Sequence, residues 1–171
     1  LYGGSGWTAM GSHCLEVFAE TNDVPLVAAF RCHDICDNNH PCFVGDAGVG
    51  MLGYVKTLLR EADTIIAVNI RFGESTTDGY ELFALPKMAA QLIHSHPSDA
   101  ELGKIYKVDL PLQASPTAMA NALSEITLKK DAGRTAWCAA AKSAYEDSFE
   151  LSVQPGVLDM GEVMTHLRKT I

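Results

Sequence analysis

The sequence contains no apolar run long enough to cross a membrane and no excess of positive charge. Its uninterrupted apolar runs, such as residues 25–30, reach about six residues, whereas a membrane-spanning helix needs about 20. Thirteen lysines and arginines stand against 21 aspartates and glutamates, which gives a formal net charge of −8. A surface that binds nucleic acid or anionic lipid would need a basic patch. The sequence therefore argues against nucleic-acid and membrane partners.

The sequence also lacks an even set of cysteines and the common catalytic motifs. A chain of 171 residues buries about 70% of its unfolded surface and needs no disulfide to hold its core. We therefore expect reduced thiols in a cytoplasmic protein. No P-loop, nucleophile elbow or paired-carboxylate motif is found, so we predict no catalytic residue in this chain. The five cysteines are Cys14, Cys32, Cys36, Cys42 and Cys138.

The hydrophobic pattern alternates between helices and extended segments, which predicts an α/β doubly wound fold with right-handed crossovers. Short, continuous apolar runs are typical of strands buried on both faces of a parallel sheet. Two polar stretches, 31–48 and 71–80, are predicted as loops. We expect helices at 8–21, 49–61, 115–126 and 157–171, and strands at 25–30, 64–70, 91–95 and 108–114.

The last third of the chain differs in composition from the rest. We expect an α/β domain over residues 1–126, a connector over 127–156 with a break at 153–156, and a helix over 157–171. Both ends of the chain resemble interrupted structural units, which suggests a piece of a longer protein. The last helix carries an apolar stripe that must find another surface, and we expect a second copy of the chain to supply it. The stripe consists of Leu158, Val163, Met164 and Leu167.

A glycine-rich turn near the start fits the relaxed dinucleotide pattern G-x-G-x-x-G/A, as Gly4-x-Gly6-x-x-Ala9. Glycines in this pattern let backbone N–H groups approach a pyrophosphate. The acidic residue expected after the second strand is missing, because Arg31 follows Phe30. The motif is therefore read either as a nucleotide-binding turn or as a tight turn that closes a strand–helix junction.

Two groups of potential metal ligands have unsuitable spacing. His94 and His96 share one face of a strand but have no evident third ligand, so we expect His96 to lie at the carboxyl end of its strand, where ligands of open α/β sheets bind. A cysteine–histidine cluster matches no zinc knuckle or ribbon, and we predict no metal site. Polar residues after the strongest strand could face a ligand or solvent. The cluster contains Cys32, His33, Cys36, His40 and Cys42, and the polar residues are Ser75, Thr76 and Thr77.

Five segments, taken in order, resemble the central domain of thiamine-diphosphate-dependent enzymes of the acetolactate synthase and 2-oxo-acid decarboxylase superfamily. The resemblance is collinear along the whole chain. The segments are GGSGW, VPLVAAFRCHDICDNNHPCFVGDAG, ADTIIAVNIRFGESTTDGY, QLIHSHPSDAELGKIY and PGVLDMGEVMTHLR.

The resemblance implies a Rossmann-like parallel sheet of about five to six strands with helices on both faces. In that family the first of three domains supplies a glutamate that activates the cofactor. The third supplies a GDG…N motif that holds the diphosphate through a divalent metal. Neither is found here, since Gly45-Asp46-Ala47-Gly48 lies where the central domain carries a GxxG loop. Thiamine diphosphate and Mg²⁺ would thus bind outside this chain, and residues 157–171 would begin the third domain.

Some family members bind FAD or ADP across the central domain. Arg71 and Phe72 match those members, whereas Asn69, His96 and Ser98 replace a glycine and two aspartates. An imidazole and a hydroxyl cannot replace carboxylates that accept hydrogen bonds from ribose, so the resemblance implies weak adenine-nucleotide binding at best. The candidate cofactor-binding residues are Gly4, Ser5, Gly6, Gly45, Gly48, Asn69, Arg71 and His96.

The function that these arguments predict is that of a non-catalytic central domain. Its parent would decarboxylate a 2-oxo acid through thiamine diphosphate and would assemble as a homo-oligomer, with the chain as scaffold beside the missing N- and C-terminal domains. A free-standing Rossmann-like nucleotide-binding module is the alternative. An NAD-dependent deacylase would need a catalytic histidine loop and a four-cysteine zinc site, which are not found.

Overall fold

Five parallel strands form the centre of the molecule. The computed structural model describes residues 1–150 and 154–170. Within this part, β1 pairs with β2 in one small sheet, and β3, β4 and β5 pair in that order in another. Every pairing is parallel, as expected for strands joined by crossover helices. The strands are β1 (Leu26–Ala29), β2 (Phe43–Ala47), β3 (Thr64–Val68), β4 (Gln91–His96) and β5 (Leu110–Gln113).

Tyr2 lies between the two sheets. It forms one parallel bridge to Ala28 of β1 and another to Val68 of β3. Its N–H donates to Val27 O at 3.1 Å, and its carbonyl accepts from Ala29 N at 2.7 Å. The predicted α/β class with parallel strands and helices is confirmed. The predicted single sheet of five to six strands is not, since the described residues form five strands in two small sheets that meet at Tyr2.

The strand β2 corrects the prediction of one long loop over residues 31–48. Phe43, Val44 and Ala47 are buried, but Gly45 and Asp46 interrupt the apolar pattern that would have indicated a strand. Gly45 has φ 112°, and a Cβ there would lie 2.8 Å from the hydroxyl of Tyr54. The backbone at Gly45 therefore adopts a conformation and a closeness that favour glycine.

Two helices begin at side-chain caps that the sequence signals. The helix α1 (Ala9–Asn22) follows Thr8, which accepts a hydrogen bond from Gly11 N, and α3 (Pro116–Ser124) follows Ser115, which accepts one from Ala118 N. These caps satisfy N–H groups that have no partner inside the helix. The α1 and α3 helices pack on each other. The helix α2 (Gly53–Glu61) begins four residues later than predicted.

Alternate residues of β1 belong to two apolar clusters on opposite sides. Val27 and Ala29 pack with α2, whereas Leu26 and Ala28 pack with α1 and α3. The alternation follows from the two-residue period of a strand. Helices therefore cover both faces at β1.

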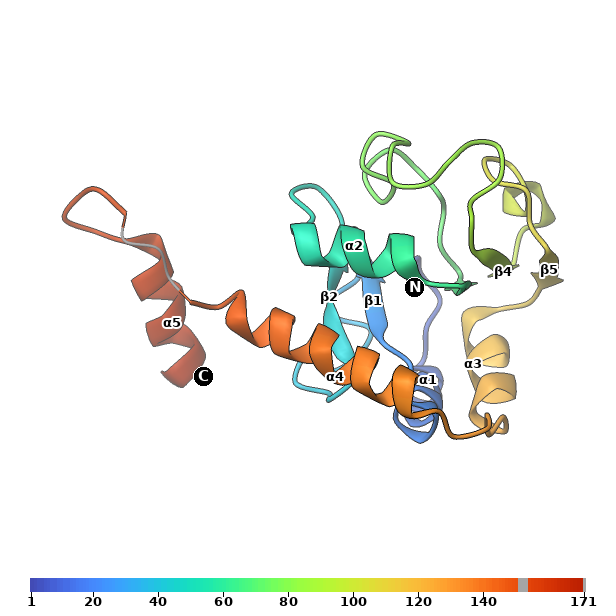
Figure 1. The fold of residues 1–171 in the computed structure, drawn as a ribbon, viewed down its shortest axis with the longest axis horizontal. Coiled ribbons are helices and arrows are strands. Elements are labelled where there is room, and N and C mark those ends of the chain that lie inside the picture. Colours follow the sequence, from blue (N-terminus) through green and yellow to red (C-terminus); the bar gives the residue numbers. More distant parts are fainter. Residues whose placement is uncertain (151–153, 171) are drawn as a thin grey trace.

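The stretch predicted as a connector contains the helix α4 (Ala132–Asp147), which is capped by Asp131. It packs along β2 and against α2. The last helix, α5 (Met160–Thr170), lies beyond the end of α4 and far from β4 and β5, at the left of Figure 1. The predicted break at 153–156 and the helix end at Ile171 fall partly outside the described residues. No described helix combines the length and the apolar character needed to span a membrane.

Candidate functional site

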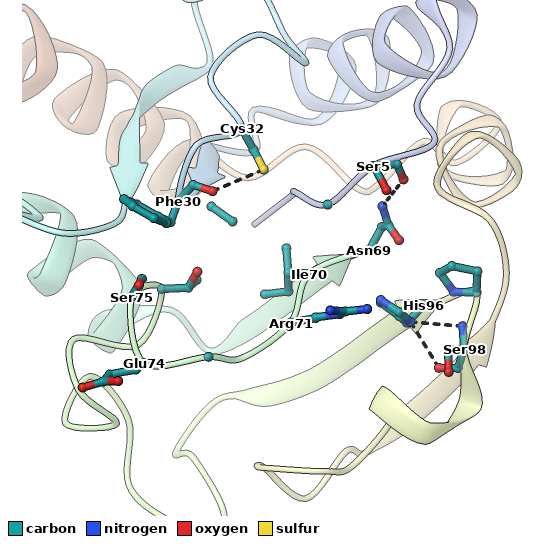
Figure 2. A pocket seen from close by; sticks show the side chains of 15 residues that line it. Ser5, Phe30, Cys32, Asn69, Ile70, Arg71, Glu74, Ser75, His96 and Ser98 are labelled. Carbon is teal, nitrogen blue, oxygen red and sulfur yellow. Dashed lines mark hydrogen bonds between the residues drawn. The ribbon is translucent and has the colours of Figure 1, made fainter.

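A cavity of about 690 Å³ opens where β1, β3 and β4 end. Figure 2 shows side chains from three strand ends and from the N-terminal turn around it. Ligands of open α/β sheets bind in crevices at the carboxyl ends of strands, so the cavity is the candidate site. It is lined by Gly4, Ser5, Ala29, Phe30, Cys32, Asn69, Ile70, Arg71, Gly73, Glu74, Ser75, Thr76, His96, Pro97 and Ser98.

The structure brings five of the eight candidate residues into this cavity and leaves three outside its lining. Gly6 lies in the N-terminal turn, Gly45 lies inside β2, and Gly48 follows β2, where a Cβ would lie 3.1 Å from the Phe30 ring. None of these three lines the cavity. The five that do are Gly4, Ser5, Asn69, Arg71 and His96.

Asn69 fixes the N-terminal turn. Its side-chain Nδ2 donates to Gly3 O at 2.9 Å and to Ser5 O at 2.8 Å. The residue is 3% exposed and has φ 57°, a left-handed conformation that asparagine tolerates better than most residues. Figure 2 shows this side chain directed at the turn. Asn69 thus acts first as a structural residue of the cavity wall.

The backbone of Gly4 packs directly against Asn69. It has φ +69°, and a Cβ at this position would collide with the carbonyl oxygen of Asn69. Gly3 is equally confined, because a Cβ there would lie 2.7 Å from Ala29 Cβ. Gly6, the second glycine of the motif, has φ +86° and no heavy atom within 4 Å of a Cβ built on it. The close packing at Gly3 and Gly4 thus accounts for a tight turn there, and both interpretations of the motif stay open.

His96 lies at the end of β4 and lines the cavity. Its Nδ1 lies 3.0 Å from Ser98 N and 3.2 Å from Ser98 O, and its tautomer decides whether it accepts from the first or donates to the second. His96 is 6% exposed, and in Figure 2 its ring lies beside the Arg71 side chain. The backbone of Ser98 therefore holds the imidazole at the wall of the cavity.

His94 lies on the same strand as His96, but its side chain is buried in the core. It is 1% exposed, and its Nε2 lies 3.0 Å from Ile70 O. Burial lowers the pKa of His94, because desolvation disfavours the charged ring. The two rings lie 6.3 Å apart between centroids, and His94 does not line the cavity.

Charge at the cavity is mixed. Arg71 Nε lies 3.8 Å from Glu101 Oε1, and Lys104 donates to the same carboxylate at 3.1 Å. The hydrogen bond from Lys104 lowers the pKa of Glu101. Glu74 is the carboxylate among the lining residues. The mouth of the cavity therefore offers one exposed guanidinium, that of Arg71, which can meet an anion.

The cysteine–histidine cluster is dispersed. Cys32 lines the cavity, and burial raises the pKa of its thiol. His33 Nε2 lies 3.4 Å from Asp46 Oδ1, whereas His40 Nδ1 accepts a hydrogen bond from Cys42 N at 3.2 Å. Across residues 1–150 and 154–170, no three histidine, cysteine or acidic side chains gather as metal ligands would.

This arrangement does not fit thiamine diphosphate. The diphosphate would need carboxylate and amide oxygens around a divalent cation, yet Asp46 faces His33 rather than a second oxygen ligand. An adenine nucleotide fits the cavity by volume, and the Arg71 guanidinium could meet its phosphates. Among the described residues, no aspartate lines the cavity to accept hydrogen bonds from ribose hydroxyls.

Sequence reasoning missed several lining residues. Phe30 and Cys32 follow β1, and Glu74 follows β3. Their positions at or just after the ends of predicted strands could have indicated that these three residues line the site. Of the polar loop residues, Ser75 and Thr76 line the cavity, whereas Thr77 is fully buried and donates to Gly73 O at 2.9 Å.

Comparison with known proteins places the chain in a family. Residues 1–123 match the family described as "Thiamine pyrophosphate enzyme, central domain". An acetolactate synthase large subunit from Parasynechococcus marenigrum (strain WH8102) is 28% identical over 172 residues, which cover 98% of this chain and 27% of that protein. An acetolactate synthase from Arthrospira platensis is 31% identical over 116 residues, 66% of this chain and 20% of that protein.

A relative that is named as a hydrolase, not as a synthase, aligns with a similar share of this chain. A 3D-(3,5/4)-trihydroxycyclohexane-1,2-dione hydrolase from Bacillus cereus (strain AH820) is 28% identical over 148 residues, 85% of this chain and 22% of that protein. The chain spans about a fifth to a quarter of the length of these relatives. The family match covers most of the chain and agrees with the parallel α/β fold, so this chain belongs to the thiamine pyrophosphate enzymes, as a central domain of that family.

Proposed function

We propose that this chain works inside a longer, acetolactate-synthase-like enzyme that acts on 2-oxo acids through thiamine diphosphate and Mg²⁺. The observation that carries the proposal is the match to the family's central domain over residues 1–123. Its support is the pattern of coverage, because 98% of this chain corresponds to only 27% of a synthase subunit. The remaining parts of such an enzyme would bind the cofactor.

The role of this chain in that enzyme is positional rather than catalytic. Its cavity offers Arg71 and His96, and the part of the chain that the structure describes holds no group of three side chains suited to a metal. When bound by the other domains, thiamine diphosphate would supply the chemistry of decarboxylation. The residues of this chain hold the sheets together at Tyr2 and keep the turn at Gly4 against Asn69.

Contact with further polypeptide is part of the proposal. Leu158, Met164 and Leu167 are 73%, 60% and 42% exposed, and each such side chain gains about 1.5–3 kcal/mol on full burial. We propose a homo-oligomer in which this face is covered. Sedimentation of the chain and of a version ending at residue 154 tests this. A dimer for the longer form alone is expected, and two monomers would contradict it.

The cytoplasm is the proposed location. Support comes from the five free thiols, which persist in a reducing compartment.

Assays of the isolated chain test the catalytic side of the proposal. We expect no release of CO₂ from pyruvate or benzoylformate when the chain is supplied with thiamine diphosphate and Mg²⁺. We also expect no calorimetric heat of binding for the cofactor. Turnover by the chain alone would overturn the proposal, because it would place the reacting centre among the residues described here.

A nucleotide-binding module is the second candidate, and the 690 Å³ cavity favours it. Calorimetry with ADP and FAD tests whether the cavity binds a nucleotide. We expect weak binding at most, which an Arg71→Ala variant would weaken further and a distant Lys87→Ala variant would not change. Sub-micromolar affinity would show that His96 and Ser98 can replace carboxylates here, and turnover of a 2-oxo acid by the longer polypeptide would then separate the two candidates.

A further inference from the structure

Two buried thiols from different elements face each other beneath α4. Cys42 immediately precedes β2, and Cys138 lies in the middle of α4. They are 5% and 6% exposed and belong to the same apolar cluster. The proposed function uses neither thiol, and neither lines the cavity.

The contacts of α4 fix their relative position. Cys138, Lys142 and Tyr145 are spaced by four and three residues, which places them on one stripe of the helix. Lys142 Nζ donates to His40 O at 3.0 Å and to Phe43 O at 3.3 Å, the carbonyls on either side of Cys42 in the chain. One turn earlier on the same stripe, Cys138 belongs to the same apolar cluster as Cys42 and shares a side-chain hydrogen bond with it.

A ring contact extends the same register. The rings of Phe43 and Tyr145 meet edge to face with centroids 5.2 Å apart. The helix is therefore held on the segment that contains Cys42 by contacts at Lys142 and at Tyr145. This register brings Cys138, at the start of the stripe, into the apolar cluster that contains Cys42.

The two thiols differ in acidity because they share a hydrogen bond. The bond from Cys42 lowers the pKa of the Cys138 thiol. The same bond, together with burial, raises the pKa of the Cys42 thiol. A thiolate is the reactive form of a cysteine, and a shared proton lets one sulfur of the pair act as the nucleophile while the other keeps the hydrogen.

We propose that Cys42 and Cys138 form a redox-active dithiol that a hydroperoxide closes to a disulfide, which fixes α4 on β2. In the first step one sulfur of the pair attacks the terminal peroxide oxygen. An S–O bond forms, the O–O bond breaks, and the alcohol or water leaves with that thiol's proton. In the second step the other thiol attacks the sulfenic sulfur. The S–S bond forms, and hydroxide leaves and takes the second thiol's proton as water.

The burial of both thiols selects the oxidant. A hydroperoxide as small as hydrogen peroxide can enter when α4 opens locally, whereas larger reagents meet the partly exposed Cys14 and Cys32 first. A covalent link from residue 42 to residue 138 closes a long loop of chain, and such links restrict the unfolded state. The oxidised chain is therefore the more stable form, and a thiol reductant reverses the change.

Peptide mapping of the 171-residue chain tests the proposal. The reduced chain is treated with hydrogen peroxide, quenched with catalase, alkylated under denaturing conditions and digested. We expect linked peptides that contain Cys42 and Cys138, two hydrogens lighter than the separate peptides and split by dithiothreitol. We also expect the melting temperature to rise by roughly 5–15 °C on oxidation.

Matched variants assign the effect. Cys42→Ala and Cys138→Ala should each abolish the oxidative rise in melting temperature, and Cys14→Ala should keep it. If either core variant fails to fold, the peptide map of the unsubstituted chain still decides. Peroxide that leaves Cys42 and Cys138 as thiols, or that links another pair such as Cys32 and Cys36, would overturn the proposal.

Discussion

Replacing Asn69 tests how the cavity wall is built. An Asn69→Ala variant loses two side-chain hydrogen bonds, to Gly3 O and to Ser5 O. Each contributes about 0.5–1.5 kcal/mol net. Alanine at φ 57° also adds strain of about 1 kcal/mol. The free energy of unfolding should therefore fall by about 2–4 kcal/mol.

Two further variants separate the hydrogen bonds from the strain. Asn69→Gly loses the same bonds without the strain, so it should be more stable than Asn69→Ala by about 1 kcal/mol. Asn69→Asp keeps the shape but directs carboxylate oxygens at two carbonyl oxygens. These oxygens raise the pKa of the new carboxyl group above that in the unfolded chain. The aspartate variant should therefore be most stable at low pH and lose stability as pH rises through that pKa.

Urea unfolding at 25 °C gives these free energies. The exposed Asn38 provides a control, since Asn38→Ala should change stability by less than about 0.5 kcal/mol. An Asn69→Ala variant as stable as the parent, or a glycine variant less stable than the alanine variant, would refute the structural role assigned to Asn69.

Three other substitutions have expected outcomes. Gly11→Ala puts a Cβ 2.8 Å from Thr117 Oγ1, so despite better helix propensity the melting curve should show a loss of about 1–2 kcal/mol. The fully buried Asn22 side chain donates to Phe18 O and Ile126 O and accepts a hydrogen bond from Leu128 N. Asn22→Ala should therefore lower the free energy of unfolding in urea by about 2–4 kcal/mol. Because burial lowers the pKa of His94, stability should decline as pH falls below about 6.5, and His94→Met should flatten that decline. Three results would contradict these expectations: a Gly11→Ala variant with a higher free energy of unfolding than the parent, an Asn22→Ala variant as stable as the parent, or a His94→Met variant whose stability falls with acid as steeply as that of the parent.

The fold was predictable where local signals agree. The apolar runs at β1 and β3 and the caps at Thr8 and Ser115 indicated elements that the structure contains. The strand β2 was missed, because Gly45 and Asp46 break its apolar pattern. Its partner in the sheet and the helix packed on it decide its conformation, and neither is visible in the local sequence.

The candidate site was predictable only in part, for a related reason. Gly4, Asn69 and His96 each follow or end a predicted element, so their meeting at one edge could be expected. The sequence could not show that the Asn69 side chain donates its hydrogen bonds to the N-terminal turn. It also could not show that Gly45 lies inside a strand, because both facts depend on contacts between distant segments.

The most direct measurement is a turnover assay of the full-length polypeptide encoded by the gene that contains this sequence, purified through an affinity tag at its C-terminus. The proposal predicts that it consumes a 2-oxo acid such as pyruvate, 2-oxobutyrate or benzoylformate. This consumption should require added thiamine diphosphate and Mg²⁺ and cease when residues 1–123 are deleted. A folded polypeptide that turns over none of these acids with the cofactor bound, or that does so equally well without residues 1–123, would contradict it.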